Sequence, residues 1–294
     1  MSVEMARLTV PKTYKLYIGG KFPRTESGRS IAVENLHGET IAHICHGSRK
    51  DFRDAVESAT KAFSSWSGIT GYLRGQILYR MAEMLESRRE EFAAAIQVTQ
   101  DVTVTTARKE VDASVDRLVR FAGWTDKYQQ VIGCANPIAG NYYNFTVPQP
   151  QGVVVAIAPT TPSLLGLITC IGAPLCSGNA VIAIGSDEHP MATAIFGEVC
   201  QTSDLPAGII NLITGSQQEL IEHIATHRQV SGVYAANVSK KTRTAIEEGA
   251  ADSVKRVRCV TIDDDAWYDN SRVASPWEIE PFVEMKTIWH PSSC

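Results

Sequence analysis

The sequence predicts an α/β protein with a doubly wound parallel sheet, because short, almost entirely apolar segments alternate with segments of helical length after residue 152. Strands that are apolar on both faces are buried on both faces, and helix-length connections are what parallel strands require. The expected sheet is therefore covered by helices on both sides. The predicted strands are 153–158, 180–184, 209–213, 232–236 and 257–262.

A mainly helical part, residues 1–135, is predicted to precede this sheet. After a short extended start, apolar residues recur three and four positions apart, which is the spacing of one helix face. The Leu, Phe and Trp side chains of these helices are expected in the core. The expected segments are extended at 14–18 and 30–33 and helical at 51–66, 72–100 and about 105–130.

Residues 136–151 are predicted to form a protruding β arm. Positions 141–147 are aromatic and β-branched, and Pro148 and Pro150 interrupt them. Proline is tolerated at the edge of a sheet but not in its centre, so this segment suits an arm better than a central strand.

The alternation stops after Ile262. Residues 263–275 begin with three aspartates and are predicted to be a structure-poor linker. Residues 276–294 then turn apolar and β-prone. They place Phe282, Glu284, Lys286 and Ile288 on one face and Val283, Met285, Thr287 and Trp289 on the other, so this strand is expected to pair with another sheet.

Composition favours a soluble globular protein. With 44% hydrophobic residues, 20% charged residues and a net charge of -4, nothing indicates a nucleic acid or a membrane as partner. No apolar run approaches the ~20 residues that cross a bilayer. The first fifteen residues lack the layout of a signal peptide, so a cytoplasmic location is expected.

The cysteines are expected to be small buried core residues. Their number is odd, their spacing is wide and no C-x-x-C pair occurs, which argues against disulfides or a zinc site. His223 and His227 lie four residues apart on an expected helix, but without an H-E-x-x-H pattern a surface face is favoured over a metal site. The cysteines are Cys45, Cys134, Cys170, Cys176, Cys200, Cys259 and Cys294.

Several segments, in the correct order, resemble the aldehyde dehydrogenase superfamily. They are Pro137-Ile138-Ala139-Gly140-Asn141-Tyr142-Tyr143-Asn144-Phe145, Pro150-Gln151-Gly152-Val153-Val154, Gly178-Asn179-Ala180-Val181-Ile182 and Leu205-Pro206-Ala207-Gly208-Ile209-Ile210-Asn211. The resemblance covers residues 14–262 and about 276–291.

This resemblance implies a Rossmann-type coenzyme domain, with the parallel sheet at 152–262, and the two pieces of the family's oligomerisation arm, 136–151 and 276–294. Between Ile262 and Pro276 the family would insert its catalytic domain, which carries the nucleophilic cysteine. This chain has thirteen residues there. It is therefore expected not to oxidise aldehydes by itself.

The catalytic positions implied by the resemblance have changed. The family's oxyanion asparagine falls on Thr161, whose hydroxyl donates one hydrogen bond without a rigid amide. The general-base glutamate falls on Val260. The nearest remaining thiol, Cys259, is expected on a central strand as a packed residue, so no catalytic residue is predicted.

The cofactor positions have changed as well. The ribose-binding lysine falls on Ile184, although Asp187 keeps the acidic position three residues later. Asn237 and Val238 replace a Gly-Ser pair where the backbone should approach the dinucleotide closely. No cofactor is expected, with weak NAD(P) binding as the alternative. The remaining vestigial positions are Pro159, Thr160, Ser186 and Gly215.

The leading hypothesis is a noncatalytic subunit that assembles with a full-length aldehyde dehydrogenase or with a second copy of itself. An unpaired arm of this kind is satisfied by pairing with another chain. The alternatives are a sensor that binds NAD(P) or another nucleotide, and an accessory subunit that contributes to NAD-dependent aldehyde oxidation in a complex. The expected interface residues are Tyr142, Tyr143, Phe145, Phe282, Val283, Met285, Ile288 and Trp289.

Overall fold

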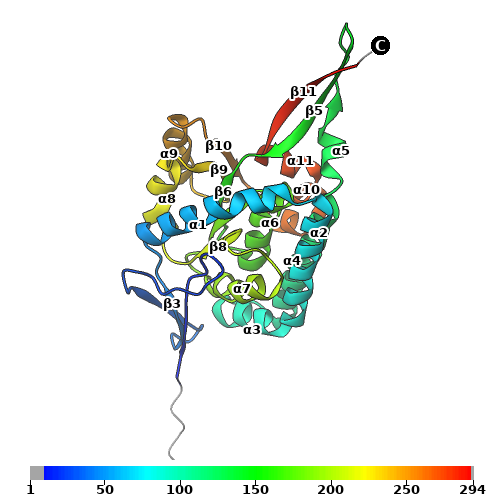
Figure 1. Ribbon diagram of the computed structural model, residues 1–294. Helices are drawn as coiled ribbons and strands as arrows, with labels where there is room; N and C mark the ends of the chain where they lie inside the picture. Colours follow the sequence, from blue (N-terminus) through cyan, green and yellow to red (C-terminus); the bar gives the residue numbers. More distant parts are fainter. Residues whose placement is uncertain (1–9, 293–294) are drawn as a thin grey trace, which may run out of the picture.

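The computed structural model describes residues 10–292, and its centre is a five-stranded parallel sheet with the order β10-β9-β6-β7-β8 (Figure 1). This confirms the predicted fold class. β6 pairs with both β7 and β9, and every residue of β6 and β7 is buried. The strands are β6 (Val153–Ile157), β7 (Ala180–Ile184), β8 (Ile210–Ile213), β9 (Val230–Ala236) and β10 (Arg256–Val260).

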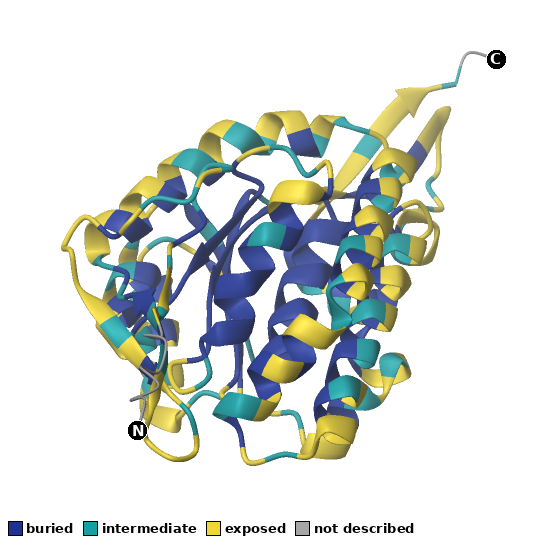
Figure 2. Cartoon of the chain, turned by 90° about the horizontal axis from the view of Figure 1, so that it is seen from below, coloured by how far each residue is buried: buried dark blue, intermediate teal, exposed yellow. Residues whose placement is uncertain are grey.

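Helices cover both faces of this sheet, as expected for a doubly wound fold. α1, α8 and α9 pack on one face and α6 and α7 on the other, with α2, α3 and α4 forming a further layer outside α6 and α7 (Figures 1 and 2). α6 is buried along its whole length because it lies between the sheet and α4. The helices are α1 (Arg49–Gly68), α2 (Gly71–Ser87), α3 (Arg89–Thr99), α4 (Val104–Trp124), α6 (Ser163–Cys176), α7 (Met191–Thr202), α8 (Gln217–Thr226) and α9 (Lys240–Ala251).

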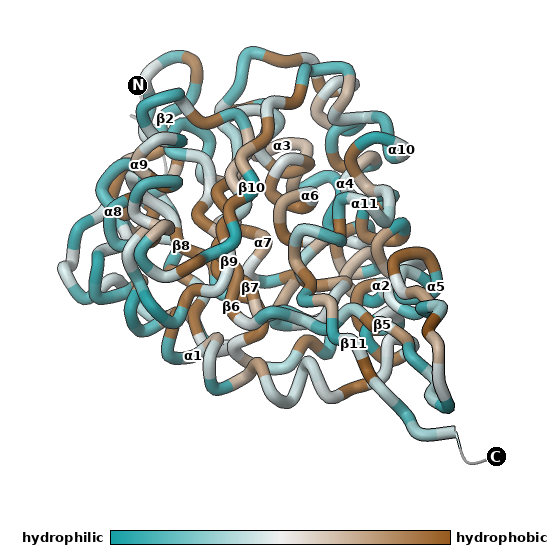
Figure 3. Tube along the Cα trace, turned by 90° about the horizontal axis from the view of Figure 1, so that it is seen from above, coloured by the Kyte–Doolittle hydropathy of each residue, from teal (hydrophilic) through white to brown (hydrophobic). Residues whose placement is uncertain are grey.

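Hydropathy follows this layering. The apolar residues concentrate in the central strands and the inner helix faces, and the polar residues lie on the outside (Figure 3). α1 begins with a capping box, in which the Ser48 side chain accepts from the N–H of Asp51 and the Asp51 carboxylate accepts from the N–H of Ser48.

The predicted helix over about 105–130 is wrong in its length. α4 ends at Trp124, and a short helix, α5 (Tyr128–Ile132), follows. The buried Thr125 donates its hydroxyl to the carbonyl of Ala122 and packs against Gly71 and Gly75 of α2. This local hydrogen bond competes with the continuation of the helix.

The N-terminal region forms a small separate sheet with the order β1-β3-β2. The extended segment predicted at 30–33 is present in β2, whereas β3 is an element that the sequence pattern did not indicate. Tyr17 forms an isolated bridge with Leu212 of β8, which attaches this region to the edge of the central sheet. The strands are β1 (Lys12–Tyr14), β2 (Ser30–Glu34) and β3 (Thr40–Cys45).

A three-stranded antiparallel sheet with the order β11-β5-β4 extends away from the body of the protein (Figure 1). β11 pairs with β5 over its whole length, from Val283 opposite Pro150 to Pro291 opposite Tyr142. The C-terminal strand therefore pairs with another sheet, as predicted, and we call this sheet the arm. Its strands are β4 (Cys134–Ala135), β5 (Tyr142–Pro150) and β11 (Val283–Pro291).

The segment 263–275 is not structure-poor, which corrects the sequence-based expectation. It contains a 3-10 helix, η1 (Asp264–Tyr268), and a short helix, α10 (Asn270–Val273), and α11 (Pro276–Ile279) follows. The Trp267 side chain is fully buried. This segment covers part of the protein's core instead of forming a solvated connection.

Arg117 of α4 holds this segment in place. Its guanidinium donates to the side-chain oxygen of Asn270 at 2.6 Å and to the carbonyl of Trp267, and also to the hydroxyl of Thr169. Burial lowers the pKa of Arg117 to about 10. The buried cation is thus satisfied by neutral acceptors, three of its donors having partners.

The cysteines only partly follow the prediction. Cys134 is exposed on β4, because the arm carries it away from the core. Cys259 lies on β10, which is the edge strand and not a central one, and is half-buried. Cys294 lies outside the described residues. The cysteines that are buried as predicted are Cys45, Cys170, Cys176 and Cys200.

Among residues 10–292, none of the helices is both long enough and apolar enough to cross a bilayer.

Candidate functional site

A crevice of about 220 Å³ lies at the carboxyl ends of the parallel strands, where ligands bind in open α/β sheets. Residues that follow β6, β7 and β9 line it, together with the first turns of α8 and α9. The sequence-predicted positions that the structure brings together here are Pro159, Thr160, Asp187, Asn237 and Val238.

Five other predicted positions do not line the crevice. Ile184 is fully buried as the last residue of β7 and offers no hydrogen-bond donor. Ser186 is buried and accepts from the N–H of His189, so its hydroxyl serves a local turn. Gly215 is packed against His46 at a φ of 125°. Thr161 is exposed outside the crevice, and Val260 ends the edge strand β10.

Gln217, which sequence analysis did not single out, bridges two strands within the crevice. Its side-chain amide donates to the carbonyl of Ala158 at 2.8 Å and to the carbonyl of Gly185 at 2.9 Å. These carbonyls follow β6 and β7, respectively. Gln217 thus satisfies two main-chain acceptors with its side chain within the crevice.

The N-termini of α6, α8 and α9, which follow strands β6, β8 and β9, already have oxygen acceptors supplied by the chain. At the start of α8, the Asp187 carboxylate accepts from the N–H of Gln217 at 2.9 Å. At the start of α6, the Glu110 carboxylate accepts from the N–H of Leu164 at 2.7 Å. α9 is capped by Ser239, whose hydroxyl accepts from the N–H of Thr242.

Asn237 adopts a left-handed conformation, with φ at 54°, at the position where the family has a glycine. Its side-chain oxygen accepts from the N–H of Ile262 at 2.7 Å, and its side-chain nitrogen donates to the carbonyl of Ile262 at 3.0 Å. Asparagine is one of the few residues other than glycine that tolerates this region. The Asn237 side chain therefore links the chain after β9 to the chain after β10, and it occupies space that a glycine would leave free.

Four of the described thiols lie in environments that disfavour the thiolate. Burial raises the pKa of Cys170, Cys176 and Cys200 well above the ordinary value for a thiol. Burial, with the nearby Glu247 carboxylate, also raises the pKa of Cys259. A reactive cysteine needs the opposite environment, which stabilises its thiolate. Within the described part of the chain, no three His, Cys, Asp or Glu side chains are grouped to hold a metal ion.

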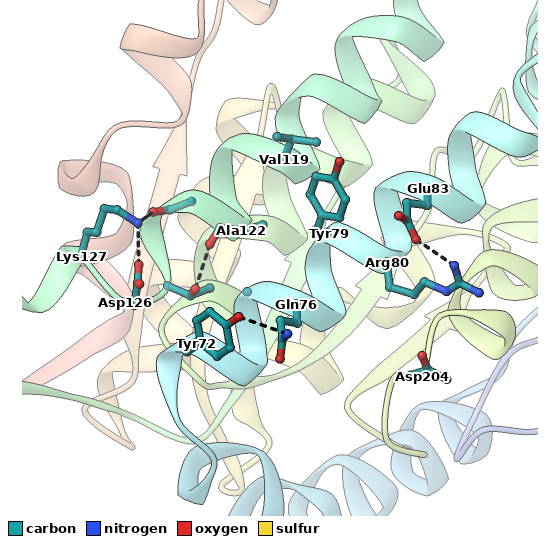
Figure 4. Close-up of a pocket in the computed structure, with 13 residues that line it drawn as sticks. Tyr72, Gln76, Tyr79, Arg80, Glu83, Val119, Ala122, Asp126, Lys127 and Asp204 are labelled. Carbon is teal, nitrogen blue, oxygen red and sulfur yellow. Dashed lines mark hydrogen bonds and ion pairs between the residues drawn. The ribbon is translucent and has the colours of Figure 1, made fainter.

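A larger groove of about 610 Å³ lies between α2 and α4 (Figure 4). Its two cationic side chains each pair with a carboxylate: Arg80 contacts Glu83 at 2.8 Å, and Lys127 contacts Asp126 at 2.7 Å. Both cations thus have carboxylate partners, which leaves neither available as the principal contact of an anionic ligand.

Known proteins share the sequence pattern of this chain. The model of the aldehyde dehydrogenase family matches residues 23–260. The putative aldehyde dehydrogenase DhaS of Bacillus subtilis is 29% identical over 249 residues, which cover 83% of this chain and 50% of DhaS. The mitochondrial 10-formyltetrahydrofolate dehydrogenase of Homo sapiens is 31% identical over 232 residues, which cover 76% of this chain and 25% of that protein.

Solved structures agree with the sequence relatives. An aldehyde dehydrogenase from Bacillus cereus, solved with NAD+, is 26% identical and superposes with a TM-score of 0.80 over 85% of this chain and 51% of that enzyme. The chain spans about half the length of DhaS and of the B. cereus enzyme. The family match extends over most of the chain. The parallel sheet, the helices around it and the order of the motifs agree with this match. This chain therefore belongs to the aldehyde dehydrogenase family.

Proposed function

We propose that this chain is a noncatalytic member of the aldehyde dehydrogenase family that acts as a structural or regulatory subunit. It assembles through its arm with a full-length aldehyde dehydrogenase or with a second copy of itself. The arm is the observation that carries this proposal, since it extends beyond the core that the chain forms with its own residues (Figure 1).

The exposed side chains of the arm support a docking role. Tyr143 and Trp289 are 69% and 60% exposed, and Tyr142, which packs edge-on against Trp289, is 49% exposed. Large aromatic side chains are costly to leave in water and are enriched in interfaces. Met285 adds a further exposed apolar side chain.

The backbone of the arm supports the same role. β11 is an edge strand of nine residues, and within residues 10–292 only its side facing β5 is paired. A long edge strand with free N–H and C=O groups is a template for pairing with another sheet. The partner that fits is therefore a chain with an open strand edge beside an apolar surface.

Two of the expected interface residues are excluded from this surface. Phe282 and Val283 are buried within the chain, and the Phe282 ring packs on Tyr234 with the ring centroids 5.2 Å apart. They anchor the base of the arm to the core. Phe145 and Ile288 lie opposite each other on β5 and β11, and both are partly exposed. They therefore remain candidates for contact with a partner.

The altered site supports the noncatalytic half of the proposal. Oxidation of an aldehyde in this family requires an activated thiolate and a general base, and four of the described cysteines, Cys170, Cys176, Cys200 and Cys259, lie in environments that disfavour the thiolate. The crevice does not fit a dinucleotide either. Ile184 provides no hydrogen-bond donor. The side chains of Gln217 and Asn237 already bond to main-chain groups at the strand ends. The helix N-termini that could receive phosphates already bind the carboxylates of Glu110 and Asp187.

The test is the mass of the assembly in solution. The chain is purified alone and after co-expression with a full-length aldehyde dehydrogenase of the same genome, and each sample is measured by size exclusion with light scattering. A single chain has a mass of 32.1 kDa. We expect a species of at least two chains, in one sample or both.

A matched pair of variants separates the arm from other exposed aromatics. Replacing Tyr143 and Trp289 by serine is expected to return the chain to the mass of a monomer, whereas Tyr72→Ser, at a 67% exposed tyrosine of α2, leaves the assembly intact. A monomer both alone and in the mixture would refute assembly. Reduction of NAD+ by the purified chain with an aldehyde would refute the noncatalytic role.

A further inference from the structure

The arm meets the body of the protein at a cavity of about 630 Å³ that contains an unpaired buried cation. The cavity lies between the start of α2, α5 and the end of β5. Its lining includes Arg74 but neither an aspartate nor a glutamate. This composition distinguishes it from the groove between α2 and α4, where the cations have carboxylate partners.

Arg74 is the anomaly in this cavity. Only 5% of the residue is exposed, and among residues 10–292 its guanidinium has no carboxylate within ion-pair distance. One nitrogen, Nη1, donates to the carbonyl of Ile69 at 2.8 Å, while Nε is buried without any partner. A buried charge is costly unless it is paired, and a native protein that keeps one usually compensates it.

The surroundings hold the guanidinium in this position. It lies against Gly178, where a Cβ would come within 3.4 Å of Nη1 and within 3.5 Å of the Pro150 ring. Gly178 has a φ of 94°, so glycine is favoured there on conformational grounds as well. The hydrogen bond to Ile69 and the close approach of Gly178 therefore hold the guanidinium at the cavity wall.

The N-terminus of α2 adds positive potential to the same cavity. Thr70 and Gly71, the cap and the first residue of this 17-residue helix, both line it. The Thr70 hydroxyl accepts from the N–H of Leu73, and the N–H groups of Gly71 and Tyr72 are the next ones at a helix start that have no intrahelical acceptor. Helix N-termini attract anions through these groups and through the helix dipole.

We propose that this cavity binds the phosphate group of a small molecule, held by Arg74 and the N-terminus of α2. Gln129 and Gln149 at the exposed rim provide further amide donors. Phe63, Ile69 and Val147 provide apolar surface for the rest of the ligand. The volume lies in the range of small-molecule sites and exceeds what a free phosphate ion needs, so a phosphate monoester fits better.

Calorimetry of the full chain in a low-salt buffer tests this with three probes: glycerol 3-phosphate, inorganic phosphate and succinate. We expect saturable binding of glycerol 3-phosphate that is tighter than that of inorganic phosphate. Equal affinity for the two phosphates assigns the site to free phosphate and overturns the monoester assignment. Tighter binding of succinate, or no saturable heat with any probe, overturns the phosphate site.

Three variants locate the binding. Arg74→Gln removes the cation and is expected to weaken glycerol 3-phosphate by about tenfold or more, as the loss of a charge-assisted hydrogen bond does. Gln129→Glu leaves Arg74 in place and adds a negative charge at the rim, so it is expected to weaken binding too. Arg80→Gln, on the same helix but facing the other groove, is the matched control and keeps the wild-type affinity.

Unchanged binding in both Arg74→Gln and Gln129→Glu would overturn the proposal. The variant Gln129→Glu also covers the case in which Arg74→Gln fails to fold, because Gln129 is exposed and, among the described residues, its side chain forms a hydrogen bond only with the neighbouring Tyr128 side chain. These measurements do not depend on assembly through the arm.

Discussion

The carboxylate of Glu110, on α4, accepts hydrogen bonds from the N–H groups of Leu164 at 2.7 Å and Leu165 at 3.3 Å, and so caps α6 from a different helix. α6 begins after Pro162, which provides no capping side chain of its own. The first helix after the first strand of the parallel sheet therefore receives its anion from within the protein. A dinucleotide phosphate would have to displace this contact to bind there.

Glu110→Ala and Glu110→Gln separate the hydrogen bonds from the charge. Removing the acceptor leaves two buried N–H groups unsatisfied, so we expect Glu110→Ala to lower the free energy of unfolding by about 1–3 kcal/mol. Glu110→Gln keeps an oxygen acceptor and removes a buried charge, so near neutral pH its stability is expected to equal or exceed that of the wild type. Urea denaturation measures both.

The same pair of proteins shows a pH dependence. Burial raises the pKa of Glu110 above its ordinary value of 4.5, while the N–H groups of Leu164 and Leu165 oppose this shift. The folded protein thus binds the proton more tightly than the unfolded chain, and the stability due to protonation is complete below pH 4.5 and lost as the pH rises through the folded pKa. The free energy of unfolding of the wild type is therefore expected to rise relative to that of Glu110→Gln as the pH falls toward 4.5. A difference in unfolding free energy between the two proteins that does not change with pH would contradict this prediction.

Trp267 is the residue through which the segment 263–275 contributes to stability. Its side chain is fully buried, and Trp277, a few residues later, is 58% exposed. We expect Trp267→Ala to cost about 3–5 kcal/mol of unfolding free energy, the range for a buried tryptophan. Trp277→Ala is the matched control and is expected to change stability by less than about 0.5 kcal/mol. Equal effects of the two substitutions would mean that the segment is not part of the core.

The central fold could be predicted from the sequence because its signals are local. Strands such as Ala180–Ile184 are apolar on both faces, and this pattern is typical of a parallel strand that helices cover on both sides. The segment 263–275 could not be predicted in this way. Its aspartates dominate the local composition, whereas the burial of Trp267 depends on Arg117, which lies 150 residues earlier.

The candidate site was likewise predictable only in part. Pro159, Asp187 and Asn237 are brought together as the family resemblance implies, because each follows a strand whose position in the sheet is fixed. The contacts that close the crevice were not predictable. Gln217 reaches back to Ala158, 59 residues away, and nothing in the order of residues around it indicates that its side chain turns inward.

Thiol labelling is expected to distinguish the described cysteines by their environment. Cys134 is exposed on β4, so N-ethylmaleimide should label it first in the folded chain. Cys170, Cys176 and Cys200 should react only on unfolding, because burial both excludes the reagent and raises the pKa of each thiol. Peptide mapping by mass spectrometry reads out each site, with Cys134→Ser as the control. Labelling of Cys259 ahead of Cys134 would reveal an activated thiol and would contradict the noncatalytic proposal.

Asn179 is the residue that fixes both strands of the arm to the body. Its side-chain oxygen accepts from the N–H groups of Gln151 at 2.8 Å and Gly152 at 2.9 Å, directly after β5. Its side-chain nitrogen donates to the carbonyl of Phe282 at 2.8 Å, directly before β11. The side chain is fully buried, so these partners have no access to water.

Asn179→Ala is therefore expected to lower the free energy of unfolding by at least about 2 kcal/mol, since each buried group left without a partner costs about 1–3 kcal/mol. Asn141→Ala, at an exposed position before β5, is the control and should leave stability unchanged. If the arm mediates assembly, Asn179→Ala also weakens the oligomer at protein concentrations where the chain is still folded. A wild-type denaturation midpoint for Asn179→Ala would show that the base of the arm is held by the strand pairing alone.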